Sequence, residues 1–359
     1  MTHAANFAMR DVLRSPFLQA AALAVVSVAL LAVLLVATGH DAGTALAALV
    51  RGAVGSSYAL LSATPVRAIP LALAGLAVAI AFRAGILNIG AEGQLLVGAV
   101  AAAGIAAFAA SHPGVPAAVI IPTMIVGGGV AGALWAGIAA WLRHRFGVLE
   151  VISTIMLNFL AIDLVGYLVR GPLQEPTRIN PQSTTLPDPL HLPVLIPGSR
   201  LHAGLLLTIV LAVGAWWWLR STASGFRLRA VGENRRAAAS AGLINVPRTA
   251  AGAFMASGAL AGLAGSVQYS GVTYALYENF SPGYGYTAIA VALLARLNPL
   301  GVLATALLFG ALEAGASAMQ RDAGVPSVVV SVVVATLILQ IVAAERWQLQ
   351  RGSSGSVSA

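Results

Sequence analysis

Runs of about 20 apolar residues recur along the chain, and they constrain its fold more than any other feature. A helix of that length crosses the roughly 30 Å hydrocarbon core of a membrane. Only 9% of the residues are charged and 58% are apolar, whereas a soluble domain has about 25% charged residues. The sequence therefore predicts an all-α membrane protein with about ten transmembrane helices. The expected spans are residues 17–38, 65–82, 94–111, 117–142, 148–169, 203–219, 249–267, 284–297, 299–319 and 325–344.

The arginines predict how these spans are oriented. Groups of basic residues occur at residues 10–14, 143–145, 220–248 and 346–351, and with ten spans all four groups fall on one side. Arginine and lysine are retained on the cytoplasmic side of membrane proteins. We therefore expect a cytoplasmic N-terminus at 1–16, a transmembrane domain at 17–344 and a cytoplasmic tail at 345–359, with both termini inside the cell.

Three further segments are not expected to be simple spans. Residues 44–62 are apolar, but Arg51 and several Gly and Ser residues interrupt them, so we expect an external or re-entrant amphipathic helix. Residues 171–202 contain seven prolines and should form an ordered external loop. Residues 220–248 should form a cytoplasmic loop.

Missing residue types exclude several kinds of chemistry. The chain has no lysine and no cysteine, so it holds neither a Walker A ATPase site, which needs lysine, nor a cysteine-ligated metal. An HExxH motif is absent as well, and no metal site is expected. The arginines end apolar runs, which indicates membrane topology and not nucleic-acid binding. An intramembrane enzyme is therefore the least favoured of the functional classes.

Acids at membrane depth carry the functional signal, because ionisable groups there usually face a cavity or a partner. They are Glu92, Glu150, Asp163 and Glu313. Glu92 lies in the glycine-rich break at 83–94, together with Asn88 and Gln94. Such a break is either a tight turn with Glu92 paired to an arginine or a broken helix beside a transport pathway, and we favour the second. Glu313, flanked by small residues, more often makes a structural ion pair.

The middle of the fifth span carries a second polar group. Asn158 follows Ser153 and Thr154, and these side chains can hydrogen-bond either a polar solute or a neighbouring helix. The sequence leaves these two roles open. Together with the break, they make Asn88, Glu92, Gln94 and Asn158 the candidate pathway residues.

The cytoplasmic loop contains good helix formers at 233–241, with Asn245 and Pro247 beyond them. One short surface helix is therefore expected. Small residues between its charges suit docking into a groove on a soluble protein, whereas the alternative is a solvated connector. The candidate coupling residues are Gly232, Glu233, Asn234, Arg235, Ala238 and Gly242.

Four segments resemble permease subunits of ABC importers, in the branch that handles nucleosides and simple sugars. They are residues 88–94, 150–158, 231–242, and 285–294 with 298–301, which occur in the family's order within 65–344. The long external loop is similar to that of permeases that work with a basic-membrane-protein-type lipoprotein. The resemblance implies a fold like that of the cobalamin importer permease, in a bacterial plasma (inner) membrane.

The resemblance also implies partners. They are a second permease, as a hetero- or homodimer, two cytosolic ATPase subunits docked on 233–242, and an external solute-binding lipoprotein. The chain itself would be a transport subunit and not an enzyme, with no cofactor of its own, since ATP is bound by the partner. A nucleoside-like solute is expected. The alternatives are a simple-sugar permease and a stand-alone proton-coupled transporter that uses Glu92, Asp163 and Glu313 as a relay.

Overall fold

The computed structural model describes residues 16–112, 114–240, 242, 244–326, 328, 329, 331, 332, 335, 336 and 339. Helices dominate these residues, and their only β contacts are three isolated bridges. The structure divides into two compact units, residues 61–310 on the one hand and residues up to 60 with those from 311 onward on the other. The helices are α2 (Pro16–Ala37), α3 (Ala42–Val54), α4 (Thr64–Arg83), α5 (Ala91–Ala110), α6 (Ala117–Phe146), α7 (Glu150–Arg170), α8 (Gly204–Ser221), α9 (Ala223–Glu233), α10 (Arg235–Ser240), α11 (Val246–Gln268), α12 (Tyr284–Leu294) and α13 (Pro299–Asp322).

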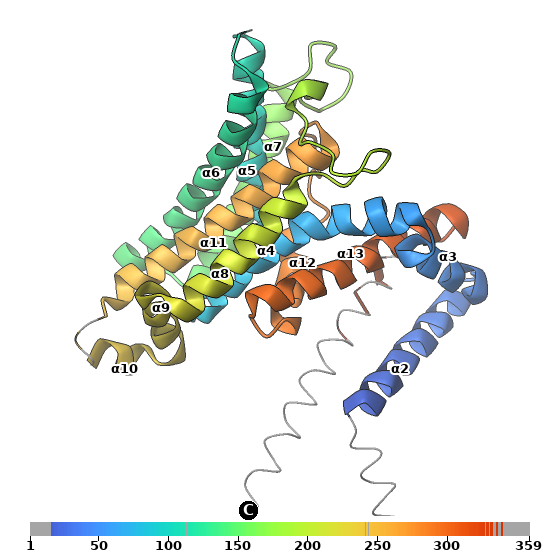
Figure 1. The fold of residues 1–359 in the computed structure, drawn as a ribbon, viewed down its shortest axis with the longest axis horizontal. Coiled ribbons are helices and arrows are strands. Elements are labelled where there is room, and N and C mark those ends of the chain that lie inside the picture. Colours follow the sequence, from blue (N-terminus) through green and yellow to red (C-terminus); the bar gives the residue numbers. More distant parts are fainter. Residues whose placement is uncertain are drawn as a thin grey trace, which may run out of the picture. The chain divides into compact units, whose positions relative to one another are not determined.

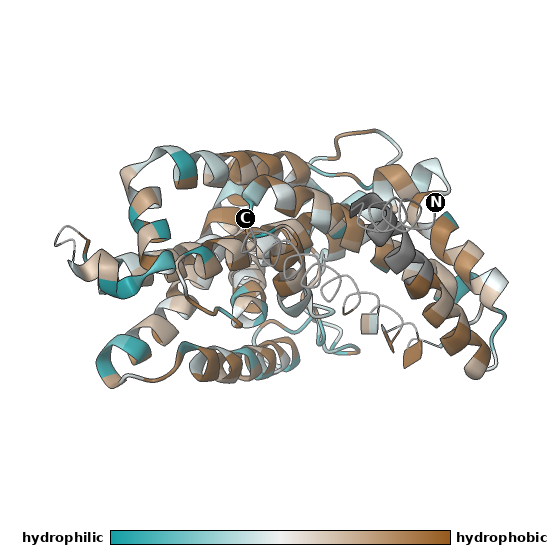
Figure 2. Cartoon of the chain, turned by 90° about the horizontal axis from the view of Figure 1, so that it is seen from below, coloured by the Kyte–Doolittle hydropathy of each residue, from teal (hydrophilic) through white to brown (hydrophobic). Residues whose placement is uncertain are grey.

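Helix α11 is the centre of the unit formed by residues 61–310, where it packs against α4, α5 and α6 (Figure 1). The α6–α11 crossing is close because Gly132 of α6 faces Gly258 and Gly262 of α11. A Cβ atom at any of the three would overlap the opposing backbone. Close packing through small residues is how helices associate in lipid, where no hydrophobic force drives them together. Most of the residues in these helices are apolar (Figure 2).

Seven described helices are long and apolar enough to cross a membrane, and they coincide with seven of the predicted spans. These are Ala59–Arg83, Ala91–Ala110, Ala117–Phe146, Glu150–Arg170, Gly204–Ser221, Val246–Thr273 and Pro299–Asp322. The chain is thus an all-α, multi-pass membrane protein. Two of the seven extend beyond their α-helices in π-helical turns, at Ala59–Ala63 and Tyr269–Thr273.

The remaining predicted spans differ in outcome. Helix α2 has 22 residues and matches the span predicted at 17–38. Helix α12 has only 11 residues, which cover about 16 Å, half of the hydrocarbon core. The prediction of a full span at 284–297 is therefore wrong in length, because the helix ends in a turn where Arg296 and Leu297 have positive φ angles. The span predicted at 325–344 lies largely outside the described residues, as do the termini 1–15 and 345–359.

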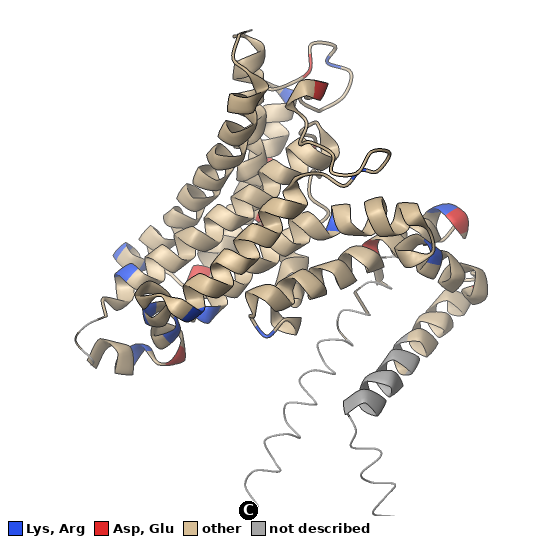
Figure 3. Cartoon of the chain, viewed as in Figure 1, with Lys and Arg blue, Asp and Glu red and all other residues tan. Residues whose placement is uncertain are grey.

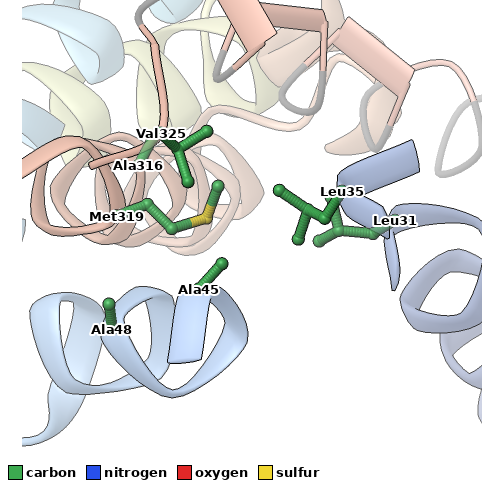
Figure 4. Packing of buried hydrophobic residues seen from close by; sticks show 7 residues of the cluster. All are labelled: Leu31, Leu35, Ala45, Ala48, Ala316, Met319 and Val325. Carbon is green, nitrogen blue, oxygen red and sulfur yellow. The ribbon is translucent and has the colours of Figure 1, made fainter. Parts of the chain in front are cut away.

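The second unit contains α2, α3 and the end of α13. Its core is a cluster that includes Leu31 and Leu35 of α2, Ala45 and Ala48 of α3, and Met319 of α13 (Figure 4). Helix α3 has 13 residues, begins at an Asp41 cap and ends at Gly55. This helix is shorter than a membrane span, and residues 59–62 belong to the span Ala59–Arg83. The external or re-entrant position expected for 44–62 stays a prediction.

The proline-rich segment 171–202 has little regular structure, as predicted. It contains one 3-10 turn at Asp188–Leu190. Backbone hydrogen bonds attach it to the segment after α11, for example from Ser183 N–H to the Leu276 carbonyl (2.7 Å) and from Leu192 N–H to the Ser270 carbonyl (2.9 Å). The loop is thus ordered and packs against the segment that follows the C-terminal end of α11.

Candidate functional site

The break predicted at 83–94 is present. Helix α4 ends at Arg83, residues 84–90 are not helical, and α5 begins at Ala91. Non-helical backbone at membrane depth needs polar partners inside the protein. Asn88 and Asn158 supply such partners here, and Glu92 and Gln94, which were also singled out in the sequence, form further hydrogen bonds beside the break.

Asn88 and Gln94 form a buried pair across the break. The Asn88 Nδ2 donates to Gln94 Oε1 (2.9 Å), and Gln94 Nε2 donates back to Asn88 Oδ1 (3.1 Å). Asn88 Oδ1 also accepts from Gly90 N–H (2.9 Å), while its Nδ2 donates to Ser257 Oγ on α11 (2.9 Å). Ser257 in turn donates to the Ala77 carbonyl of α4 (2.6 Å). The pair therefore ties α5 to α11 and α4.

Asn158 fastens the break to α7. Its Oδ1 accepts from Gly93 N–H (2.8 Å), and its Nδ2 donates to the Ile89 carbonyl (2.9 Å) and to the Tyr286 hydroxyl (3.2 Å). The side chain is fully buried. The sequence left open whether Asn158 binds a solute or a neighbouring helix. Its hydrogen bonds in the structure are with neighbouring segments of the chain.

Glu92 caps α12. Its Oε2 accepts a hydrogen bond of 2.7 Å from Gly285 N–H, in the first turn of that helix, and the Ser281 hydroxyl also hydrogen-bonds the carboxylate. The first N–H groups of a helix have no partner within it and attract negative charge. The partner of Glu92 is thus a helix N-terminus and not the arginine of the alternative interpretation.

Asp163 occupies a different environment. It is exposed on α7, one turn from Phe159 and one turn from Tyr167, which are 56% and 68% exposed. Positions four apart lie on the same face of a helix, so a carboxylate stands between two aromatic rings on one open face. A charge facing lipid at helix centre costs about 2.5–3.5 kcal/mol. The sequence showed an acid at membrane depth, but its exposure and its aromatic neighbours emerge only in the structure.

The coupling segment contains two helices: α10 corresponds to the helix predicted at 233–241, whereas α9 before it was not predicted. Helix α9 ends at Glu233, and Asn234 has an extended backbone. The Asn234 Oδ1 accepts from Arg236 N–H and Ala237 N–H (both 3.0 Å), so it caps α10. Asparagine is among the strongest N-cap residues, and this is the sequence signal for the boundary between the two helices.

Two contacts attach this segment to the break. Arg235 Nη2 donates to the Gly85 carbonyl (2.8 Å). A Cβ atom at Gly232 would overlap the Arg83 carbonyl, so only glycine allows this close approach. Of the other predicted coupling residues, Glu233 and Gly242 are exposed, whereas the Ala238 side chain is 5% exposed and faces the protein.

Arginines gather at the end of the bundle where α9 and α10 lie (Figure 3). Arg143 at the end of α6 forms an ion pair with the buried Glu150 at the start of α7. At the other end, Arg170 pairs with Glu278, and this hydrogen-bonded pair lowers the pKa of Glu278. His202, in the loop before α8, is 1% exposed. Burial, aided by Arg200, lowers its pKa to about 4.

Within the described residues, no three His, Asp or Glu side chains gather into a metal site. The site is instead a set of side-chain and backbone hydrogen bonds that joins α5, α7, α11 and α12. It connects through Gly85 to a charged surface segment. Such an arrangement can transmit movement between the surface and the interior of the bundle.

Comparison with known proteins agrees with this architecture. Residues 60–343 match the family described as the branched-chain amino acid transport system / permease component. The chain is 39% identical over 296 residues to a glucose ABC transporter permease protein of Haloferax volcanii, covering 80% of this chain and 77% of that protein. It is 38% identical over 312 residues to a guanosine ABC transporter permease protein of Bacillus subtilis, covering 86% and 88%.

A nucleoside ABC transporter permease protein of Lactococcus lactis is 35% identical over 283 residues, with 76% of each chain covered. No solved structure matches. Permeases of this family act with ATPase and substrate-binding partners and are not themselves enzymes. The chain belongs to this permease family and is a permease subunit of an ABC importer, in the branch of nucleoside and sugar permeases.

Proposed function

We propose that this chain forms half of the translocation pore for a nucleoside-like solute, with a second permease as the other half. The observation that carries the proposal is the connection from α10 to the interior. Arg235 binds the Gly85 carbonyl, and the segment that follows Gly85 is held by Asn88, Gln94 and Asn158. A push on α10 therefore has a route of direct contacts into the bundle.

ATP binding and hydrolysis belong to two partner ATPases, which dock on residues 233–242. The exposed residues Arg236, Ala237 and Ala239 of α10 form the docking face, because Ala238 faces inward. The ATPases that have closed around ATP bind one of two pore states more tightly than the other, and this difference in affinity favours that state. Asn88, Glu92, Gln94 and Asn158 shape the pathway by holding the break in place, and Gly232 keeps α9 against α4.

The orientation follows from the arginines of the unit formed by residues 61–310. Those at 83, 143, 145, 220, 227, 229, 235, 236, 248 and 296 lie at one end, and those at 67, 170, 178 and 200 lie toward the other. The positive-inside rule puts the α9–α10 end in the cytoplasm. The loop at 171–202 then faces the external binding protein, a lipoprotein. The segment 278–297 reaches from one end of this unit to the other although α12 is short, since Glu278 pairs with Arg170 and the Arg296 carbonyl accepts from Arg83 at the end of α4. We therefore keep ten crossings and the cobalamin-importer type of fold in the proposal, with both termini in the cytoplasm.

The nucleoside assignment rests on relatives and on one helix face. Two of the relatives are named as guanosine and nucleoside permeases. The face of Phe159, Asp163 and Tyr167 offers aromatic rings for a nucleobase and a carboxylate for ribose hydroxyls. A glucose-like sugar is the second candidate, favoured by the 39% identity to a glucose permease. Both solutes carry vicinal hydroxyl groups.

Uptake of labelled solute into proteoliposomes tests the proposal. The vesicles contain this chain, its second permease and the ATPases, and the binding protein is supplied outside. ATP-dependent uptake competed by unlabelled guanosine, but not by glucose, is the expected result. Competition by glucose alone replaces the solute and keeps the mechanism. Uptake by this chain alone, driven by a proton gradient, contradicts the mechanism.

A further inference from the structure

A pocket of about 490 Å³ opens at the arginine-rich end of the bundle, beside the break, from which Ile86 lines it. It lies between the end of α6, the start of α7, α10 and the start of α11. Its polar lining is made by Arg143, His144, Glu150, Arg235 and Arg248. Arg235 also makes the contact with Gly85 described for transport, whereas His144 and Arg248 take no part in the contacts described so far.

The pocket is positively charged. It has three arginines and a histidine against a single acid, and that acid, Glu150, is already paired with Arg143. Arg235 donates to the Gly85 carbonyl. The side chains of Arg248 and His144 have no ion pair or hydrogen bond with any residue that the structure describes. Two exposed basic groups therefore point to an anionic ligand from outside the chain.

The remaining walls are apolar and lead toward the membrane interior. Trp141, Phe254 and Met255 line the pocket. Trp141 also ends a stripe of exposed side chains on one face of α6, spaced three or four residues apart: Val126, Val130, Leu134, Ile138 and Trp141, each between 39% and 62% exposed. Gly137, at the pocket end of this stripe, has no heavy atom within 4 Å of where its Cβ would be. A hydrocarbon chain along α6 would meet the charged pocket at its end.

We propose that this pocket binds the phosphate headgroup of an anionic phospholipid, with Arg248 and His144 as phosphate ligands and an acyl chain along the α6 stripe. Basic pockets between helices at the cytoplasmic surface are typical sites for anionic lipids, and Trp141 suits the interface between headgroups and acyl chains. A free phosphate ion would explain the charge but has no use for the apolar stripe. Because the lipid contacts the start of α7, the end of α6 and α10 together, it would also brace the coupling segment.

Native mass spectrometry of the purified complex, released from nanodiscs of mixed phosphatidylcholine and phosphatidylglycerol, tests the proposal. The Arg248→Gln variant, which removes one arginine from the pocket, is expected to retain about fivefold less phosphatidylglycerol. The amount of retained phosphatidylcholine should not change. Gly137→Leu should lower it as well by filling the pocket without changing a charge. The matched controls are Arg227→Gln on α9 and Gly214→Leu on α8, both outside the pocket, and both should retain the lipid.

Three results would overturn the proposal. The first is equal retention of phosphatidylglycerol in the Arg248→Gln and Gly137→Leu variants and their controls. The second is full displacement of the lipid by millimolar inorganic phosphate, which would identify a site for a free anion. The third is loss of the ATPase subunits from Arg248→Gln while the lipid is retained, which would identify the pocket as an ATPase contact. These readouts do not depend on the transported solute, so they stand apart from the uptake assay.

Discussion

The side-chain oxygen of Asn158 on α7 accepts a hydrogen bond of 2.8 Å from the backbone N–H of Gly93, which lies 65 residues earlier in the chain. The same amide donates to the Ile89 carbonyl. The Asn158 side chain thus hydrogen-bonds one backbone N–H and one backbone carbonyl near the point where α5 begins. The non-helical segment exists at membrane depth because this asparagine and Asn88 satisfy its polar groups.

Replacing Asn158 with leucine should destabilise the protein strongly. The substitution keeps the branched shape and the number of heavy atoms but leaves Gly93 N–H and the Ile89 carbonyl without partners, at about 1–3 kcal/mol for each buried group. Thermal unfolding in detergent measures the change. Met156→Leu, on the exposed face of the same helix, is the matched control and should unfold like the parent. Equal midpoints for Asn158→Leu and the control would contradict the role given to Asn158.

Glu92→Gln should impair uptake while leaving the complex assembled. The amide oxygen of glutamine can still accept from Gly285 N–H, so the helix contact survives, but hydrogen bonds to charged acceptors are roughly twice as strong as neutral ones. The weaker bond loosens α12 from α5. Uptake in proteoliposomes and the subunit ratio after size-exclusion chromatography are the measurements. Normal uptake by Glu92→Gln would reduce Glu92 to a structural cap.

Arg235→Ala should uncouple ATP hydrolysis from transport. It removes the hydrogen bond to the Gly85 carbonyl, whereas Arg227→Ala removes an exposed arginine of α9 whose side chain has no partner in the described part of the chain. We expect solute-stimulated ATPase activity to fall in Arg235→Ala and to be retained in Arg227→Ala. An equal effect of both variants would mean that the loss of positive charge, and not the loss of the contact with Gly85, causes the effect.

The docking face of α10 can be mapped by crosslinking, because the chain has no native cysteine. Cysteine at the exposed Ala239 should crosslink to a partner ATPase in membranes. Cysteine at Ala238, whose side chain is buried, should crosslink poorly under the same conditions. The reverse pattern would mean that α10 turns its other face to the ATPase.

Much of the fold could be predicted because lipid imposes a simple rule on the sequence. Apolar length alone located seven spans, and glycines with polar residues located the break at 83–94. The length of α12 was not predictable in this way, since it depends on a turn at Arg296 and Leu297. Asn234 as a cap was readable from the sequence in principle, and the predicted helix began one residue before it, but α9 at Ala223–Glu233 was not predicted.

The site was predictable as a set of residues but not as a set of contacts. Asn88, Glu92 and Asn158 were visible as polar groups at membrane depth. Their partners Ser257, Gly285 and Tyr286 lie 169, 193 and 128 residues away, respectively. Such pairings arise from tertiary packing, which no local pattern encodes. The exposure of Asp163 likewise depends on which face of α7 the other helices cover.

Asp163→Asn should weaken recognition of the solute. If the carboxylate binds hydroxyl groups, its loss removes a hydrogen bond to a charged group worth about 1.5–3 kcal/mol, which corresponds to roughly 10- to 150-fold in apparent affinity. The KM for uptake should rise while the maximal rate changes little. Leu160→Ala, an exposed residue of α7, is a control for loss of surface on the same helix. An unchanged KM would exclude Asp163 from solute binding.

His202 should make the fold sensitive to acid. Its pKa is lowered to about 4 by burial, whereas an unfolded histidine titrates near 6.5. Above about pH 6.5 both states are neutral, and between about 6.5 and 4 only the unfolded state binds the proton, so stability is lost as the pH falls. The loss approaches about 3 kcal/mol at most. Unfolding midpoints measured from pH 7 to pH 4 should fall less steeply in His202→Gln than in the parent. His112→Gln, at the exposed end of α5, should keep the parent's slope, and equal slopes in all three proteins would show that His202 does not set the acid sensitivity.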